Sequence, residues 1–249
     1  MKFLKLVLAI LLAILPSIFK IPLYRWLFQY DIGKNVRIGL TIFVQVEDCT
    51  IGDGVNIGHF NCFYRTQKID LGNFTKIGAF NLFRGGEQIN IGCYSTILRY
   101  NTFNSIINPE LVNPTEPILQ LGKAVFIAAG HWLDFTDKIM IGDNTIIGGR
   151  NSSLWTHNRQ RTRSISIGCN CYLGSEIRVA PGVQVASFCI IALGSVLMGT
   201  FDTSEVLIAG NPANIVRSLQ ESDRFLISQK TRADIPDDLN SQCLETLNS

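Results

Sequence analysis

Residues 167–197, IGCNCYLGSEIRVAPGVQVASFCIIALGSVL, decide the fold, because an aliphatic residue returns there at every sixth position. The unbroken series is Ile167, Leu173, Val179, Val185, Ile191 and Leu197. The same period starts earlier, with interruptions, at Ile32-Gly33, Ile51-Gly52, Leu71-Gly72, Ile91-Gly92, Leu121-Gly122 and Ile141-Gly142. A fixed short period of this kind indicates a solenoid.

Three six-residue turns make one triangular coil of about 18 residues, with each aliphatic side chain pointing inward. Stacked coils bury these columns, and their backbones pair from coil to coil at roughly 4.8 Å. The sequence therefore predicts an all-β solenoid, a parallel β-helix of about eight coils and on the order of 40 Å long. We expect three parts: a helical segment at 1–30, the β-helix at 31–217, and a C-terminal helix and tail at 218–249.

The composition argues against a nucleic-acid partner, a disulfide scaffold and a metal site. Charged residues make up 17% of the chain, the net charge is +2, and no basic run suits nucleic acid. Seven cysteines show no disulfide-scaffold spacing. Cys169 and Cys171 form a C-x-C pair without a second pair or a nearby histidine, so we expect small apolar fillers in a reducing cytosol and no metal site.

One polar position repeats along the coils and includes a histidine. The fifth residue of the second turn is Asn61, Asn81, Asn101, His131 and Asn151. Because stacked strands place equivalent residues above one another, these side chains should form a hydrogen-bonded column. His131 is then either part of that column or a direct contact to the acceptor substrate.

Two interruptions of the period are long enough to carry a site, at about 104–120 and 154–166. The second contains His157, followed by Arg159, Arg161 and Arg163, the densest positive cluster in the chain. A histidine in an extruded polar loop suits a general base. The alternative is a solvated basic loop without chemistry.

Several short motifs of this sequence resemble those of the hexapeptide-repeat O-acetyltransferases. The galactoside and maltose acetyltransferases are similar members of that family. The motifs are MIGDNT at 140–145, WTH at 155–157, ISIG at 165–168, YLGS at 172–175, APGV at 180–183, GSV at 194–196 and AGNPA at 209–213. The resemblance covers about 32–217, and its closing third is the specific part. It implies a left-handed β-helix, a homotrimer and acetyl-CoA as the donor co-substrate.

The resemblance also implies roles for individual residues. His157 matches the catalytic histidine, and Asp134, His131 and Trp155 fall on the acceptor side, although Asp137 fits the acidic position as well as Asp134 does. The implied cofactor contacts are Tyr172, Ser175, Gly194, Ser195 and Arg217. Where relatives have a Thr-Lys pair this chain has Met198-Gly199, so one phosphate contact is missing; either Arg161 or Arg163 replaces it, or the nucleotide is held more loosely.

The N-terminal segment is uninterrupted apolar sequence from Leu6 to Leu15, extended by Phe3 and by Ile18-Phe19. Pro16 breaks it, and a second apolar stretch follows at 21–30. A signal peptide, a single membrane span and a kinked element lying on the membrane are three interpretations. The third fits best, because only ten residues are uninterrupted and no small-x-small cleavage site follows. It predicts a peripheral or monotopic protein on the cytoplasmic face of the inner membrane.

These observations favour an acetyl-CoA-dependent O-acetyltransferase that modifies a sugar hydroxyl of a surface polysaccharide or its lipid-linked precursor. A non-catalytic scaffold or glycan-binding protein is the alternative. A zinc enzyme of the γ-carbonic-anhydrase type needs three converging histidines, and this chain has only His59, His131 and His157, without an H-x4-H pair. We expect residues 218–230 to cap the last coil as a short helix that uses Leu219, Phe225, Leu226 and Ile227.

Overall fold

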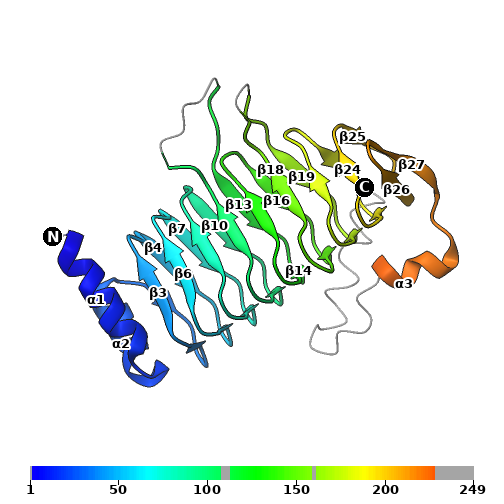
Figure 1. Cartoon of the computed structure of the whole chain (residues 1–249). Helices are drawn as coiled ribbons and strands as arrows, with labels where there is room; N and C mark the ends of the chain where they lie inside the picture. The colour runs from blue at the N-terminus through cyan, green and yellow to red at the C-terminus, as the bar shows by residue number, and fades with distance from the viewer. Residues whose placement is uncertain (1, 108–112, 159–160, 228–249) are drawn as a thin grey trace, which may run out of the picture.

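Three parallel sheets wrap around one axis, and the chain passes through them in turn (Figure 1). The structure is a computed structural model that describes residues 2–107, 113–158 and 161–227. Sheet A contains β1 (Asp31–Ile32), β4 (Asp48–Ile51), β7 (Lys68–Leu71), β10 (Gln88–Ile91), β13 (Ile118–Leu121), β16 (Ile139–Ile141), β19 (Ile165–Ile167), β22 (Gln184–Val185) and β25 (Thr200–Phe201).

Sheet B contains β2 (Arg37–Ile38), β5 (Asn56–Ile57), β8 (Lys76–Ile77), β11 (Thr96–Ile97), β14 (Phe126–Ile127), β17 (Ile146–Ile147), β20 (Tyr172–Leu173), β23 (Ile190–Ile191), β26 (Val206–Gly210) and β27 (Ala213–Ser218). Sheet C contains β3 (Thr41–Val44), β6 (Asn61–Tyr64), β9 (Leu82–Arg84), β12 (Thr102–Asn104), β15 (Trp132–Asp134), β18 (Ser153–Trp155), β21 (Arg178–Val179) and β24 (Val196–Leu197).

These strands make eight complete coils, and a ninth coil adds only β25 and β26. The predicted fold class, a left-handed parallel β-helix with helical segments at both ends, is confirmed. The six-residue period supplies the core, since Ile51, Leu71, Ile91 and Leu121 lie in register on sheet A and are at most 2% exposed.

The glycine that follows many of these aliphatic residues has a steric cause. At Gly78 an added Cβ would lie 2.2 Å from the carbonyl oxygen of Leu98, in the next coil. Only a residue without a side chain lets neighbouring coils approach so closely at this corner. In each Ile-Gly pair, the isoleucine side chain therefore packs in the core and the glycine forms the tight corner that follows.

Two helices close the N-terminal end of the solenoid. They are α1 (Lys2–Ile14) and α2 (Ser17–Leu27), separated at Pro16 as the sequence predicts. Tyr24 is buried against Phe43 of coil 1, with ring centroids 5.5 Å apart. Ser17 Oγ donates to Ile38 O and accepts from Ile38 N, both at 2.9 Å, so α2 is fixed to β2. The two helices, which we call the N-terminal cap, therefore cover the first coil.

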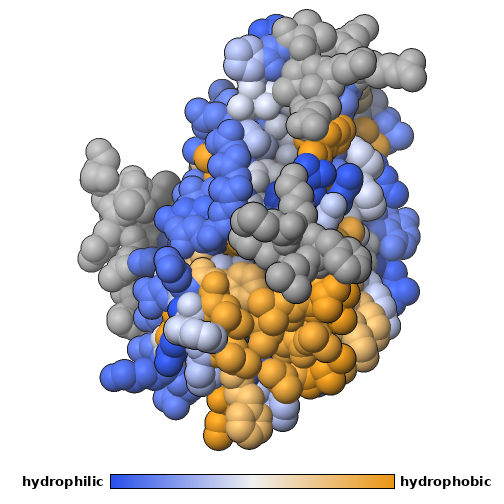
Figure 2. All heavy atoms as spheres, turned by 90° about the vertical axis from the view of Figure 1, so that its left-hand side faces the viewer, coloured by the Kyte–Doolittle hydropathy of each residue, from blue (hydrophilic) through white to orange (hydrophobic). Residues whose placement is uncertain are grey.

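The outer surface of the N-terminal cap is apolar, and Figure 2 shows it on the end of the solenoid. Its exposed residues include Ile10, Leu11, Ile14, Ile18, Phe19 and Trp26, with exposed fractions from 44% to 76%. Of the helices in the described residues, none is long and apolar enough to cross a membrane.

The C-terminal end differs from the expected helix at 218–230. β27 turns back and pairs antiparallel with β26, and within the described residues helical turns follow at η1 (Glu221–Asp223) and α3 (Arg224–Ile227). Of the expected helix residues, Leu219 precedes these turns, and Phe225 and Leu226 are exposed. Of these four residues only Ile227 is buried. Residues 228–230 and the predicted tail lie outside the described residues.

Candidate functional site

Both long interruptions leave the solenoid at the same corner, between sheets C and A. One joins β12 to β13, and the other joins β18 to β19. Asn113 of the first loop donates from Nδ2 to Thr162 O of the second, and Thr162 N donates back to Asn113 Oδ1, both at 3.0 Å. The two loops therefore hold each other in place.

His157 lies two residues after β18 ends, in the second of these loops, and is half-buried. The preceding residue, Thr156, is fully buried, and its Oγ1 lies 2.8 Å from Asp134 O and 3.2 Å from Asp134 Oδ1. The same oxygen accepts a hydrogen bond from Asp137 N at 2.9 Å. Thr156, which the sequence did not single out, thus anchors the backbone that presents His157.

Asp134 and Asp137 both lie beneath this loop but differ in their contacts. Asp134 is 2% exposed, and its Oδ1 accepts from Thr136 N at 3.1 Å as well as facing Thr156. Asp137 Oδ1 accepts from Lys138 N at 2.8 Å and from Glu116 N at 3.2 Å. Among the described residues no hydrogen bond joins either carboxylate to His157. Both hold turns in place, and an acceptor contact by Asp134 stays a prediction.

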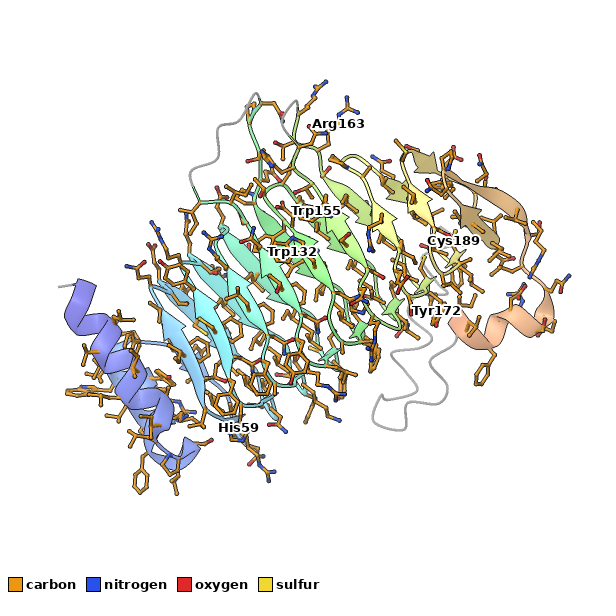
Figure 3. All side chains as sticks on the ribbon, viewed as in Figure 1. His59, Trp132, Trp155, Arg163, Tyr172 and Cys189 are labelled. Atoms are coloured by element: carbon orange, nitrogen blue, oxygen red, sulfur yellow. The ribbon has the colours of Figure 1, made fainter. Side chains whose placement is uncertain are left out.

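Trp155 stands beside this loop and stacks on Trp132 of the preceding coil. The ring centroids are 5.7 Å apart, and both side chains remain about 40% exposed (Figure 3). Trp155 was predicted as an acceptor contact, whereas Trp132 was not. The two come from different columns of sheet C, since Trp155 is in register with Asp134 and Trp132 with Ser153. Sequence spacing alone therefore gave no signal that they meet.

His131 belongs to the buried polar column. It is 1% exposed, its backbone N donates to Asn101 Oδ1 at 2.9 Å, and its Nδ1 accepts from Ser152 N at 3.2 Å. Burial lowers the pKa of His131 to about 4, so the ring is neutral. Its Nε2 is buried without a partner. A buried ring offers nothing to an acceptor, so the structure favours the column interpretation.

The column contains one residue that the sequence misplaced. Asn151 was expected next above His131, but Ser152 takes that position, and Asn151 is exposed. The reason is one extra residue at the corner between β17 and β18, which shifts the register by one. Ser152 Oγ then donates to Gly174 O at 3.2 Å.

Three of the predicted cofactor residues gather at another corner, between sheets B and C. Tyr172 lies over Gly148, where an added Cβ would be 3.0 Å from its hydroxyl oxygen. Ser175 fills the space beside Gly149, and Gly194 N donates to Ser175 O at 2.9 Å. Gly194 is exposed with open space above it. The structure thus brings Tyr172, Ser175 and Gly194 together.

This corner and the His157 loop lie at opposite ends of the sheet C strands, as the labels Tyr172 and Arg163 in Figure 3 show. One side of a coil spans about six residues, on the order of 20 Å in extended chain. Within one protomer, the predicted base and the predicted cofactor residues are therefore separated.

The remaining predicted cofactor residues have other contacts. Ser195 is buried, and its hydroxyl donates to Ala192 O at 2.7 Å. Arg217 makes a two-pronged contact with Asp223, at 2.6 and 3.2 Å, which raises the pKa of Arg217 and lowers that of Asp223. Arg163 is exposed in the His157 loop, with its aliphatic part against Gly182. Of these three side chains, only that of Arg163 faces solvent without a described polar partner.

The described residues hold no group of three or more His, Cys, Asp or Glu side chains placed to bind a metal ion. Cys171, half of the C-x-C pair, is buried, and its Sγ lies 3.2 Å from Ala186 O.

The chain is similar to known acetyltransferases over parts of its length. No protein-family model matches it. It is 34% identical over 59 residues to a putative acetyltransferase of Saccharomyces cerevisiae, covering 24% of this chain and 30% of the relative. It is 26% identical over 114 residues to serine acetyltransferase 2 of Arabidopsis thaliana, covering 43% of this chain and 35% of the relative. The matches thus span about a third of the length of each relative.

Among solved structures, the polysialic-acid-specific acetyltransferase NeuO superposes over 87% of this chain and 98% of its own, at 17% identity and a TM-score of 0.43. A likeness of this degree carries no information on substrate or mechanism. The six-residue repeat and the coils that it builds make the chain a hexapeptide-repeat β-helix, and the curated relatives that it matches over part of their length are named acetyltransferases.

Proposed function

We propose that the protein is an acetyl-CoA-dependent O-acetyltransferase acting on a sugar hydroxyl of a surface polysaccharide or of its lipid-linked precursor. The observation that carries this proposal is His157, half-buried on a loop anchored by Thr156 and braced by Asn113. The names of the two curated relatives support the reaction type.

His157 acts as the general base. It takes the proton of the acceptor hydroxyl as the oxygen attacks the thioester carbonyl of acetyl-CoA. The tetrahedral oxyanion then collapses, the carbon–sulfur bond breaks, and the imidazolium returns the proton to the departing thiolate. The products are the acetyl ester and free CoA, and no enzyme nucleophile is needed.

The acting unit is a homotrimer. Two facts support this. His157 lies at the corner between sheets C and A, whereas Tyr172, Ser175 and Gly194 lie at the corner between sheets B and C, at the opposite end of the sheet C strands. A neighbouring protomer that places its own B–C corner beside the His157 loop would complete the site. Arg163, on the loop itself, is then available to the phosphates of the donor.

The acceptor is a carbohydrate. Trp132 and Trp155 present about 40% of their surface in a stacked pair next to the His157 loop. Flat apolar surface of this kind fits the apolar face of a sugar ring, while Asp134 lies within the same coil pair. The same feature also suits the alternative, a protein that binds glycans without modifying them.

The protein is peripheral on the cytoplasmic face of the inner membrane, where acetyl-CoA is present. The apolar outer surface of the N-terminal cap supports this placement, because such a surface is stabilised at the boundary between lipid and water (Figure 2).

The test of catalysis is His157→Ala, with His59→Ala as the matched control. Loss of a general base should lower the rate of CoA release in the presence of a glycan acceptor by roughly 10²- to 10⁴-fold. The control should keep its rate, and both variants should keep their sedimentation coefficient and melting temperature. Transfer that survives in His157→Ala rejects the mechanism, and glycan binding without transfer by the wild type favours the non-catalytic alternative.

The test of membrane placement uses substitutions rather than deletion, because removal of the cap would uncover coil 1. The triple change Leu11→Gln, Ile18→Gln and Trp26→Gln alters only exposed side chains. It should move the protein from the membrane fraction to the soluble fraction. A control triple at the other end, Leu193→Gln, Met198→Gln and Phe225→Gln, should leave the distribution unchanged.

A further inference from the structure

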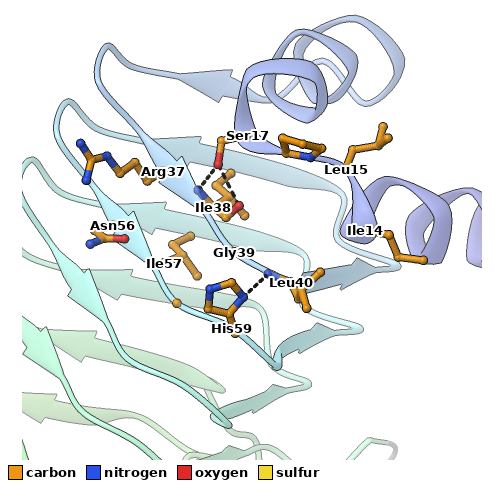
Figure 4. Close-up of a pocket in the computed structure, with 12 residues that line it drawn as sticks. Ile14, Leu15, Ser17, Arg37, Ile38, Gly39, Leu40, Asn56, Ile57 and His59 are labelled. Atoms are coloured by element: carbon orange, nitrogen blue, oxygen red, sulfur yellow. Dashed lines mark hydrogen bonds between the residues drawn. The ribbon is translucent and has the colours of Figure 1, made fainter.

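A pocket of about 580 Å³ lies beside the apolar surface of the N-terminal cap (Figure 4). It is formed where α1 ends and α2 begins and by the first two coils of the solenoid. Ile14 belongs to both features, since it lines the pocket and is 67% exposed on the cap. The pocket therefore continues the apolar surface that we place on the membrane.

The two sides of the pocket differ in chemistry. Ile14, Leu15 and Leu40 supply apolar surface on one side, and Arg37 and Asn56 lie on the opposite side in Figure 4. No Asp or Glu side chain is among the lining residues. Within the described part of the chain, the Arg37 guanidinium has no hydrogen-bond or ion-pair partner. An exposed cation next to apolar surface is complementary to a group with an anionic head and an apolar tail.

His59 presents a donor to the same space. Its Nδ1 accepts a hydrogen bond from Leu40 N at 3.2 Å, so the proton of the neutral ring is on Nε2. The free N–H is thus available to an acceptor oxygen. Arg37 and His59 come from neighbouring coils and reach the pocket from sheet B and from the corner that follows it.

A buried cation lies behind the pocket wall. Lys20 is fully buried, and its Nζ donates to Ala13 O at 2.8 Å and to Gly39 O at 2.7 Å. Gly39 itself lines the pocket. The described residues offer Lys20 no carboxylate partner. Its charge therefore adds to the positive potential at this place.

We propose that this pocket binds the phosphate headgroup of an anionic phospholipid in the bilayer on which the N-terminal cap rests. Arg37 and the His59 Nε2–H contact the phosphate oxygens, and Ile14, Leu15 and Leu40 contact the first carbons of the acyl chains. The inference rests on the membrane placement proposed above and not on the acetyl transfer. Such a site would make the protein select anionic headgroups, whereas the apolar surface of the cap alone would bind any lipid.

The test is flotation of the full-length protein with vesicles of phosphatidylcholine alone or with added phosphatidylglycerol. The wild type should bind the phosphatidylglycerol vesicles more tightly. Arg37→Gln with His59→Gln should lower that affinity at least about fivefold, the effect of one basic side chain at an anionic surface. Its affinity for phosphatidylcholine should fall much less, because the choline ammonium of that lipid opposes Arg37 and the apolar cap is intact.

The matched control is Arg65→Gln, which removes an exposed arginine from coil 2 at the C–A corner, outside the pocket. It should keep the preference for phosphatidylglycerol. Equal losses in the control and the pocket variant would mean diffuse attraction by net charge and would overturn the site. Equal binding of both vesicle types by the wild type would overturn it as well.

A second arm separates lipid from free phosphate. The His59 ring resonances should shift with short-chain phosphatidylglycerol and not with inorganic phosphate at the same concentration. An equal response to inorganic phosphate would assign the pocket to a soluble anion instead. Transfer to a soluble glycan should be the same in the wild type and the pocket variant, so failure of the lipid site is distinguishable from failure of the proposed reaction.

Discussion

In the buried polar column, His131 takes the place of an asparagine. The asparagines of this column all make the same hydrogen bond. Asn61, Asn81 and Asn101 each donate from Nδ2 to a carbonyl oxygen of the next coil, at 2.8 to 2.9 Å. His131 keeps the acceptor of the column in its Nδ1 and leaves Nε2 buried without a partner. An unpaired buried donor costs roughly 1–3 kcal/mol.

His131→Asn should therefore change the pH dependence of stability. The pKa of His131 is about 4 in the folded protein, below the ordinary value near 6.5, so the unfolded chain binds the proton more readily between these values. Stability present above pH 6.5 is lost as the pH falls toward 4, by about 2 kcal/mol between pH 7 and pH 5.

Denaturant unfolding at both pH values would measure this. The asparagine variant should lack that part of the loss and should be at least as stable as the wild type at pH 7. An identical pH slope in the two proteins would contradict the assignment.

At this scale the sequence predicted positions better than contacts. It placed Asn61, Asn81, Asn101 and His131 in one column because each is the fifth residue in the second turn of its coil, whatever the length of the loop between coils. It misplaced Asn151, because a single extra residue at the corner between β17 and β18 shifts the register by one, so the core residue after Ile147 is Leu154 and not Ser153. Thr156 and the pairing of Trp132 with Trp155 could not be predicted, since they depend on side chains from different columns.

Two columns of stacked aromatic rings run along the coils at the scale of the strands. Phe43, Phe63, Phe83 and Phe103 stack inside the solenoid with centroids 4.5 to 4.8 Å apart. Phe60, Phe80 and Tyr100 stack outside it at 4.9 to 5.1 Å. The stacking geometry is similar, but Phe83 is 0% and Phe80 is 47% exposed.

These columns offer a matched pair of substitutions. Phe83→Ala should lower the free energy of unfolding by about 3–5 kcal/mol, because it leaves a cavity between two rings. Phe80→Ala should cost less than about 1 kcal/mol, because its ring remains half in water. Chemical denaturation of both variants measures the difference, and similar costs would show that stacking rather than burial stabilises the coils.

The two braced loops form a second testable element. Asn113→Ala removes both hydrogen bonds to Thr162 while the coils keep their core. Trypsin should then cleave after Arg161 or Arg163 several times faster, with an unchanged melting temperature. Cleavage at the wild-type rate would mean that the loops hold their positions independently.

The elements themselves were predictable where the period continues and unpredictable where it ends. The number of coils and the break at Pro16 follow from spacing and from the geometry of proline. The return of β27 onto β26 does not, because an antiparallel hairpin carries no six-residue signal. The sequence also did not indicate that the N-terminal cap packs on coil 1. Apolar residues of the cap lie on both faces of its helices, and the pattern does not distinguish those that face the core from those that face solvent or lipid.

For the whole molecule, the position of His157 along the axis sets a distance from the proposed membrane. The N-terminal cap covers coil 1, and His157 follows the last strand of coil 6. Five steps between coils amount to roughly 24 Å. An acceptor hydroxyl in the bilayer surface would lie too far away.

Lipid-linked acceptors in vesicles should therefore be acetylated only when they carry an oligosaccharide long enough to reach that height. A lipid with a single sugar should be a poor acceptor, and the same sugars free in solution should show no such threshold. Mass spectrometry of the products measures both. Equal acetylation of short and long lipid-linked acceptors would contradict a placement in which the solenoid axis points away from the membrane.

The unlike ends of the solenoid have a consequence for self-association. Parallel strands at an open edge would pair with the next molecule and grow into a fibre. Here α1 and α2 cover the first edge, and β27 occupies the exposed side of β26 in the opposite direction. Because the helices cover the first coil, another copy cannot continue the sheets from that end, so head-to-tail growth is blocked.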